Sequence, residues 1–338
     1  MKVALIGAGY FGQFHIDAWK RAEGATLAAI VDPDPSKAAA GVPGFADAMA
    51  MVEAIQPDIV DIASPPPTHL PLIETLSPFV KNIICQKPFC GGLADAEKAV
   101  KIAAANGARV IVHENFRYQP WHMEAQRLLA TGAVGDPYEI TFRLRPGDGQ
   151  GPAAYLARQP YFQQMERFLV HETAIHVIDV FRAMFGEPDG VYADLRRLNP
   201  AIRGEDAGLI VLDYADGRRA VFDGNRLADH RAESRRLTMG EMEVEGAAGS
   251  LRLNGDGEIS LRAHGANDER AHEYAWEDRN FGGDCVYISS LKYLDSFRSG
   301  APHPTEAAAY LANMRIVEAA YRSAAEGRRI DLAQGPDA

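Results

Sequence analysis

The sequence contains few cysteines, no long apolar run and no excess of basic residues. Its three cysteines have no Cys-x-x-Cys spacing and cannot all pair with one another, which suits a reducing compartment and argues against a zinc knuckle. No apolar run reaches the ~18 residues of a membrane span, and a strand-like run begins almost at Met1, so we expect no signal peptide. A net charge of −11 disfavours nucleic acid, whose binding usually needs a basic face. We expect a cytoplasmic protein that binds neither membranes nor nucleic acid.

The chain of 338 residues is too long for one ordinary core, so we expect two domains. Over about the first 115 residues, short β-runs such as KVALIGAG (2–9) and TLAAIVDPD (26–34) alternate with helical segments. This alternation predicts a doubly wound α/β domain, in which helices cover both faces of a parallel sheet. From about residue 137, alternating apolar and polar residues separated by Asp-Gly and glycine-rich turns predict an antiparallel sheet built from hairpins.

A glycine-rich turn follows the first strand and opens a helix. In GAGYFG, the residues Gly7, Gly9 and Gly12 have the G-x-G-x-x-G spacing. The first glycine permits a tight turn, the second lets backbone approach a pyrophosphate, and the third lets the helix pack on the strand. Asp32 ends the second strand twenty residues later and has no Arg or Lys beside it, which favours NAD over NADP. The alternatives are a flavin site, a nucleotide-sugar site or a plain strand-turn-helix.

Two further strand ends extend this site, because ligands of such sheets lie beyond the carboxyl ends of the strands. SPPPTH (64–69) ends one strand, and IICQKPF (83–89) places Lys87 after another, next to Pro88. A direct contact of His69 with the cofactor and a role without chemistry are equally compatible with the sequence. The expected cofactor-binding residues are Gly7, Gly9, Tyr10, Phe11, Gly12, Asp32, Ser64, Pro65, His69, Gln86 and Lys87.

We predict a Rossmann domain at residues 1–118 and a second α/β domain at 119–338, with an open, mainly antiparallel sheet. Its C-terminal helices could pack back on the first domain.

With these motifs the chain resembles the Gfo/Idh/MocA oxidoreductases, named for glucose-fructose oxidoreductase and inositol dehydrogenase. CQKP stands where that family has Glu-Lys-Pro, and ENFRYQPW (114–121) where it has an Asn-x-Arg segment. The H-x-x-D helix (176–179) and the segment EAAYRSAAEGRRIDL (318–332) also match. The resemblance implies hydride transfer between NAD(P) and a hydroxyl-bearing carbon of a sugar, polyol or related compound, with Lys87 touching the reacting hydroxyl. The chain departs from the family at Gln86, which replaces the usual Glu, and at MERFLV (165–170), which replaces a glycine-rich lead-in.

The stretch FLVHETAIHVID (168–179) is close to the zinc motif H-E-x-x-H, but its histidines are five residues apart. On a regular helix His171 and His176 lie about 140° apart, so we predict no metal site. Glu172 and His176 are four apart, and the family has an Asp and a His at this spacing. A neutral histidine suits removal of a hydroxyl proton near neutral pH. We therefore assign His176 as general acid/base, Glu172 as an orienting or substrate-binding carboxylate and Lys87 as the partner that polarises the hydroxyl. Asp179 is assigned as a structural partner.

Other polar residues near this helix could line a sugar pocket. The expected substrate-binding residues are Lys87, Asn115, Arg117, Tyr155, Arg158, His171, Glu172 and His176. We find no cluster of Arg or Lys near the helix that would favour a phosphorylated substrate.

The predicted function is that of an NAD-dependent dehydrogenase of a free sugar or polyol, including an aldose oxidised at its anomeric carbon to a lactone. The alternatives are an enzyme for a non-sugar carbonyl or dihydrodiol, and a non-catalytic NAD-binding sensor. Because an open apolar sheet face is usually buried against another subunit, we also predict a homo-dimer or homo-tetramer.

Overall fold

The computed structural model describes residues 1–332, which form two compact units. Residues 1–115 and 284–314 make the first unit, and residues 116–283 with the chain from 315 onward make the second. The chain thus leaves the first unit after Asn115, returns to it for the helix α7 (Cys285–Ser299), and leaves it again within α8 (Ala307–Glu326). No helix of the described part is long and apolar enough to cross a membrane.

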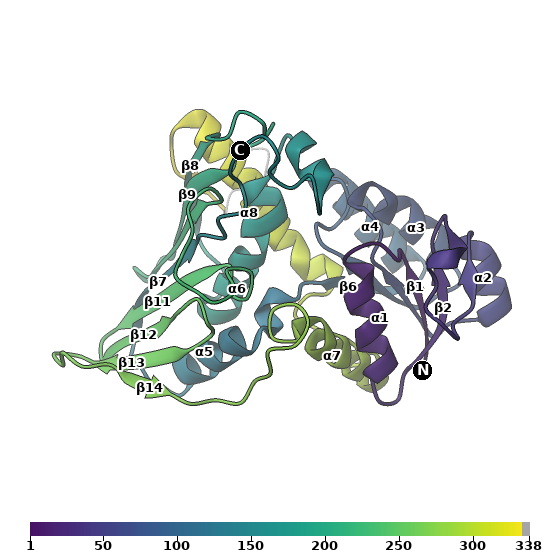
Figure 1. Cartoon of the computed structure of the whole chain (residues 1–338), viewed down its shortest axis with the longest axis horizontal. Coiled ribbons are helices and arrows are strands. Elements are labelled where there is room, and N and C mark those ends of the chain that lie inside the picture. The colour runs from purple at the N-terminus through teal and green to yellow at the C-terminus, as the bar shows by residue number, and fades with distance from the viewer. Residues whose placement is uncertain (333–338) are drawn as a thin grey trace. The chain divides into compact units, whose positions relative to one another are not determined.

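The first unit is built on a six-stranded parallel sheet (Figure 1). Its strands are β1 (Lys2–Ile6), β2 (Thr26–Val31), β3 (Gly44–Phe45), β4 (Ile59–Ile62), β5 (Asn82–Gln86) and β6 (Arg109–His113), in the order β3-β2-β1-β4-β5-β6. The connecting helices are α1 (Gly12–Arg21), α2 (Ala48–Ile55), α3 (His69–Leu76) and α4 (Leu93–Ala105). The inner strands are buried on both faces, which explains their nearly continuous apolar sequence. The predicted doubly wound α/β domain is confirmed, and the reversal of strand order between β1 and β4 creates the crevice where such sheets bind nucleotides.

The second unit is built on a nine-stranded sheet. Its strands are β7 (Pro137–Leu144), β8 (Gly190–Arg196), β9 (Ala207–Asp213), β10 (Arg219–Asn225), β11 (Gly240–Gly246), β12 (Gly249–Leu253), β13 (Ile259–Ala263), β14 (Arg270–His272) and β15 (Ile330–Asp331). They lie in the order β14-β13-β12-β11-β7-β10-β9-β8-β15, and neighbours are antiparallel except for the parallel pair β7 and β10. The predicted open, mainly antiparallel sheet is therefore confirmed.

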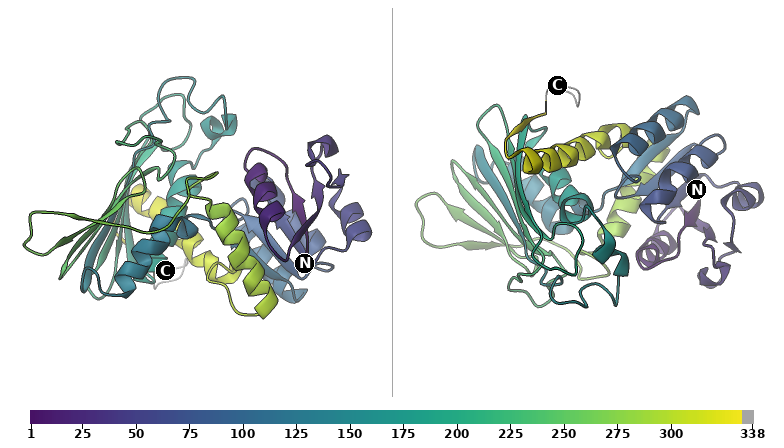
Figure 2. Two further views of the ribbon diagram at one scale, coloured as in Figure 1. Left: turned by 60° about the horizontal axis from the view of Figure 1, so that its bottom comes forward. Right: turned by 90° about the horizontal axis from the view of Figure 1, so that it is seen from above.

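The two faces of this sheet differ. The helices α5 (Pro120–Ala130) and α6 (Ile175–Phe185) lie on one face (Figures 1 and 2). Side chains of the sheet such as Phe142 and Phe222 are fully buried. The other face was expected to be apolar, and this is only partly correct. Along β7, β11 and β12 it carries ion pairs between strands, including Arg252 to Glu243 at 2.8 Å. Exposed apolar side chains occur on β8 and β9, at Tyr192 and Leu209.

Candidate active site

The glycine loop between β1 and α1 has the geometry of a dinucleotide cradle. A Cβ on Gly7 would lie 2.7 Å from the Ser64 nitrogen, and a Cβ on Gly12 would lie 2.2 Å from the Gly7 carbonyl oxygen. Both positions are therefore limited to glycine by close backbone packing. A Cβ on Gly9 would meet no atom within 4 Å, so the space beside Gly9 is open to a phosphate that approaches the backbone. The neighbouring Tyr10 is exposed, and Phe11 packs edge-on against the ring of Phe14.

Asp32, at the end of β2, is joined directly to this loop. Its Oδ2 accepts a hydrogen bond from the Ala8 N–H at 3.0 Å, while Oδ1 accepts one from the Asp34 N–H at 3.0 Å and one from Lys37 Nζ at 3.1 Å. Burial opposes ionisation, but these hydrogen bonds and the lysine charge hold the pKa of Asp32 below its ordinary value. A carboxylate offers about four acceptor positions, so Asp32 keeps acceptor capacity for ribose hydroxyls. The sequence-based statement that no lysine lies beside Asp32 is wrong, because a short 3₁₀ turn (Pro35–Lys37) brings Lys37 back onto it.

The SPPPTH turn is held in place by His69. The ring of His69 is fully buried; its Nε2 lies 2.8 Å from the Ser64 carbonyl oxygen and its Nδ1 lies 3.2 Å from the Cys90 nitrogen. The carbonyl can only accept and the backbone N–H can only donate, so the ring is neutral with its proton on Nε2. Burial agrees with this, because it lowers the pKa of His69 to about 4. In this arrangement the buried His69 ring holds the Ser64 carbonyl and the Cys90 N–H in place, and a direct contact with the cofactor stays a prediction.

Lys87 follows the last residue of β5 and is half-buried. Its backbone N–H donates to the side-chain Oε1 of the preceding Gln86 at 2.7 Å. Gln86 itself is buried, so the amide side chain acts inside the protein rather than as an exposed cofactor ligand. The strand end therefore fixes the position of the Lys87 backbone within the first unit.

In the second unit, the segment that carries Glu172 and His176 is not the regular helix that was predicted. Leu169–Ala174 form a π-helical turn, which continues into α6, and the Ile175 N–H bonds to the Val170 carbonyl five residues earlier. His171 and His176 therefore do not lie on one regular α-helix, so the angle of about 140° calculated for such a helix does not apply to them. Within residues 1–332, however, no group of three or more His, Cys, Asp or Glu side chains is arranged to hold a metal ion.

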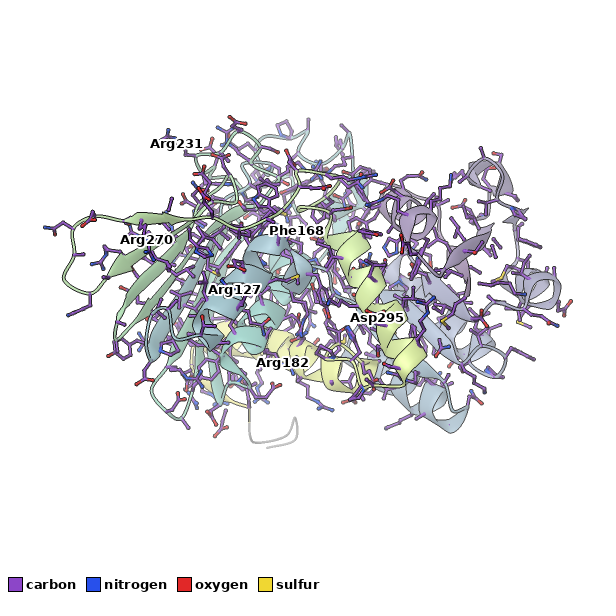
Figure 3. All side chains as sticks on the ribbon, turned by 90° about the horizontal axis from the view of Figure 1, so that it is seen from below. Arg127, Phe168, Arg182, Arg231, Arg270 and Asp295 are labelled. Atoms are coloured by element: carbon purple, nitrogen blue, oxygen red, sulfur yellow. The ribbon has the colours of Figure 1, made fainter. Side chains whose placement is uncertain are left out.

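Glu205 fixes the beginning of this turn, and sequence reasoning missed it. Its Oε1 accepts hydrogen bonds from the N–H groups of Phe168 at 3.1 Å and Val170 at 3.0 Å, and another from the hydroxyl of Tyr321 at 2.5 Å. A carboxylate at this point satisfies N–H groups that a helix start leaves without partners. Phe168 lies where the chain enters the helical segment (Figure 3).

Arg226, on the loop side of β10, is a second residue that was missed, and it links most of the polar groups around Glu172. Its side chain is almost fully buried; it donates to Asp148 Oδ2 at 2.8 Å, to the Tyr155 hydroxyl at 2.8 Å and to Thr173 Oγ1 at 2.7 Å. The Thr173 hydroxyl in turn donates to Glu172 Oε2 at 2.7 Å, and that oxygen lies 3.9 Å from Arg226 Nη1. Burial would lower the pKa of Arg226, but Asp148 and its other anionic neighbours hold it above its ordinary value.

The same cluster contains Tyr155 and Arg158, which were predicted to bind substrate. Tyr155 is buried and also contacts Asp148 through its hydroxyl at 3.1 Å, whereas Arg158 is partly exposed and lies 3.3 Å from Asp148. Burial raises the pKa of Asp148, yet Arg226 outweighs it and keeps the carboxyl ionised. The sequence predicted no cluster of Arg or Lys near the helix that would favour a phosphorylated substrate. Arg158 and Arg226 do meet here, but Asp148 lies against both and neutralises much of their charge.

His176 is nearly buried, and its imidazole stacks on Phe116 with ring centres 3.9 Å apart and planes 8° apart. Phe116 belongs to the segment ENFRYQPW, so this segment orients the ring. The neighbouring Arg117 makes a two-point ion pair with Asp179 at 2.5 and 2.6 Å, which agrees with a structural role for Asp179. Asn115 belongs to the first unit and is buried there, with its Nδ2 3.2 Å from Cys285 Sγ.

The predicted residues therefore fall into two groups. The glycine loop, Asp32, the SPPPTH turn, Gln86, Lys87 and Asn115 belong to the first unit, whereas Arg117, Tyr155, Arg158, His171, Glu172 and His176 belong to the second. Backbone N–H groups and one carboxylate dominate the first group, which fits a dinucleotide. The second combines an imidazole, a carboxylate and a buried arginine, which fits a neutral polyhydroxy compound.

Comparison with known proteins gives the same assignment along nearly the whole chain. Residues 1–114 match the GFO_IDH_MocA family model, an oxidoreductase family with an NAD-binding Rossmann fold, and residues 122–252 match the GFO/IDH/MocA C-terminal domain. A D-apiose dehydrogenase from Paraburkholderia graminis is 34% identical, over 98% of this chain and 89% of the relative. A D-apiose dehydrogenase from Rhizobium rhizogenes is 32% identical, over 98% and 97%. The crystal structure of an oxidoreductase from Agrobacterium radiobacter in complex with NAD⁺, L-tartaric acid and magnesium is 30% identical and covers 98% of both chains, with a TM-score of 0.86.

Proposed function

The chain belongs to the GFO/IDH/MocA family of NAD-binding oxidoreductases, and from this membership we propose that it oxidises a free five-carbon aldose with NAD. Two relatives that are similar over 98% of the chain are D-apiose dehydrogenases, so D-apiose is the first candidate substrate. Oxidation of the anomeric hydroxyl of such a sugar gives a lactone. The roles proposed for the two parts of the chain are NAD binding for residues 1–118 and substrate binding for residues 119–338.

The observation that carries the proposal is the charge balance beside His176. Glu172 lies four residues before it on the same π-to-α segment, and the cationic Arg226 is already paired with Asp148. Sugar hydroxyls are good donors to a carboxylate such as Glu172, whereas a phosphate would need a cation that is not already neutralised. The arrangement therefore supports a neutral, hydroxyl-rich substrate.

Each side chain has a definite task in this reaction. Bound NAD⁺ supplies the hydride acceptor. We assign to His176 the removal of the anomeric hydroxyl proton, which a neutral imidazole can accept. Glu172, oriented by the Thr173 hydroxyl, accepts a hydrogen bond from a neighbouring sugar hydroxyl. Lys87 donates a hydrogen bond to the reacting oxygen and stabilises the negative charge that develops as the proton leaves. The glycine loop and Asp32 hold the dinucleotide.

The test is NADH formation by the purified protein with NAD and a panel of free sugars: D-apiose, other pentoses, hexoses and inositols. We expect turnover with D-apiose or another pentose and a kcat/KM at least about tenfold lower with phosphorylated sugars, which corresponds to about 1.4 kcal/mol. A preference for a phosphorylated sugar, or turnover only with a non-sugar carbonyl, would reject the proposal.

We also propose that two copies associate through the open face of the large sheet, and that the protein works in the cytoplasm. Tyr192 and Leu209 supply exposed apolar side chains at the β8–β9 part of this face, and ion pairs between strands such as Arg252 to Glu243 supply polar groups at its β11–β12 part. The three cysteines are free and buried, as suits a reducing compartment. Light scattering should give a dimer or tetramer, and the double variant Tyr192→Arg/Leu209→Arg should shift it toward monomer. A wild-type monomer at micromolar concentration would contradict the association.

A further inference from the structure

We propose that the buried chain Asp61–His15–Gln86 is a positioning relay that fixes the Lys87 backbone and requires a neutral His15. The proposal concerns the first unit alone, and its link to turnover rests on the proposed function. The sequence shows Gln86 only as an unexplained departure from Glu. The structure supplies a physical reason for the amide.

The orientation of the Gln86 amide follows from its two contacts. Its Oε1 lies 2.7 Å from the Lys87 backbone nitrogen, whose N–H can only donate, so this atom is the oxygen. The amide NH₂ group must then face His15, whose Nε2 lies 3.2 Å away. An NH₂ group can only donate, and therefore Nε2 of His15 carries no proton.

The other side of the imidazole confirms this order of donors. Nδ1 of His15 lies 2.7 Å from Asp61 Oδ2, and the same oxygen accepts a hydrogen bond from the Trp19 indole N–H at 2.7 Å. Since Nε2 is an acceptor, the proton of the ring is on Nδ1 and points to the carboxyl oxygen. All three side chains of the relay are buried, so water does not replace these hydrogen bonds.

The surroundings of the ring contain several aromatic side chains and a second imidazole. The His113 ring on β6 packs 4.3 Å from the His15 ring, and its Nε2 lies 3.3 Å from the Ser289 hydroxyl on α7. Phe11 of the glycine loop packs against both imidazoles. The titratable groups close to this pair include Asp61, the buried thiol of Cys85 on β5, and Tyr293, whose ring centre lies 5.6 Å from that of His113.

The relay explains why an amide suits position 86 in this chain. A glutamate there would place an acceptor against Nε2 of His15, and two acceptors would then flank one neutral ring. The ring would have to take up a second proton and become an imidazolium. Gln86 avoids this, because Asp61 already accepts the proton of Nδ1, while the amide oxygen holds the Lys87 N–H.

The direct test is ¹⁵N NMR of histidine-labelled protein at neutral pH, since ring nitrogens with and without a proton have well-separated resonances. The His15 signals are assigned by their loss in His15→Asn, or through backbone connectivities if that variant does not fold. We expect the neutral Nδ1–H form in the wild type and a doubly protonated ring in Gln86→Glu, with no change in the exposed control Gln126→Glu. A wild-type imidazolium, an Nε2–H form or a neutral ring in Gln86→Glu would overturn the proposal.

The positioning role is tested by kinetics with the sugar that the wild type oxidises. Gln86→Leu removes the bond to the Lys87 N–H and should lower kcat about tenfold, with little change in the Kd for NAD, because misplaced reacting groups slow the chemical step. Gln86→Glu keeps an acceptor for that N–H and should restore most of kcat, while shifting the pH profile of kcat/KM. Equal kcat in Gln86→Leu and wild type would refute positioning. If no sugar is oxidised, the proposed function fails, but the NMR result still decides the relay.

Discussion

In the first unit, the residues proposed to bind NAD, here called the cofactor half, use mainly backbone: a turn limited by Gly7 and Gly12, open space at Gly9 and one carboxylate at the end of β2. In the second unit, the residues proposed to bind substrate, here called the substrate half, are side chains from distant segments, with Arg226 joined to Asp148, Tyr155 and Thr173. A backbone site needs only a short local pattern of residues. A side-chain site depends on which segments the fold brings together. Its stability depends on buried charges that must remain paired.

The largest effect is expected at the two residues proposed to touch the reacting hydroxyl. His176→Ala removes the proposed base and should lower kcat/KM about 10³-fold, within the range of general acid–base catalysis, with an unchanged Kd for NAD. Lys87→Ala should cause a loss of similar size. The exposed His264→Ala is the matched control and should retain full activity. Activity of His176→Ala within threefold of wild type would assign the base elsewhere.

Arg226→Met tests whether buried charge stabilises the substrate half. It leaves Asp148 without its main partner, and breaking a buried ion pair in this way costs about 3–5 kcal/mol of unfolding free energy. The control Arg219→Met removes an exposed arginine that lies 3.7 Å from Glu139, and should cost less than about 1 kcal/mol. Chemical denaturation measures both. Equal losses would mean that the arginine cluster is no more important for stability than the sheet surface.

Acid should destabilise both units through buried neutral histidines, His69 in the first and His122 in the second. Burial lowers the pKa of each from 6.5 to about 4. Between these values the unfolded chain binds more protons, so this stability is complete above pH 6.5 and is lost as pH falls to 4. Each histidine should contribute about 3 kcal/mol to the loss. Denaturation curves at pH 7 and 4.5 should show a smaller loss in His122→Leu, and an unchanged pH dependence would contradict the assignment.

The smallest effect separates the two roles of glycine in the cofactor half. Gly9→Ala adds a Cβ that meets no protein atom, so stability should be unchanged while the Kd for NAD rises about tenfold, or 1.4 kcal/mol. Gly12→Ala forces a Cβ against the Gly7 carbonyl and should destabilise the fold by about 1–3 kcal/mol. Calorimetry and denaturation measure the two quantities. Loss of stability in Gly9→Ala with normal NAD binding would reverse the assignment.

The sequence predicted the features that depend on local pattern: the parallel and antiparallel sheets, the glycine loop and the family, all of which are confirmed. It could not predict the π turn, because Glu205, some 35 residues away, binds the N–H groups at its start. The sequence pattern places Arg226 at the end of an ordinary strand, and only the fold brings it to Asp148 and Thr173. Lys37 was missed for a simpler reason, since a three-residue turn reverses the chain after Asp32.

The central claim is that the protein transfers a hydride from the anomeric carbon of a free aldose to NAD. The most direct measurement uses D-apiose deuterated at C1, or the best pentose of the panel, and locates the deuterium by mass spectrometry and NMR. We predict that it appears at C4 of the NADH nicotinamide, together with the lactone. NADH without deuterium would show that another carbon is oxidised, and deuterium released to water without NADH would contradict the account.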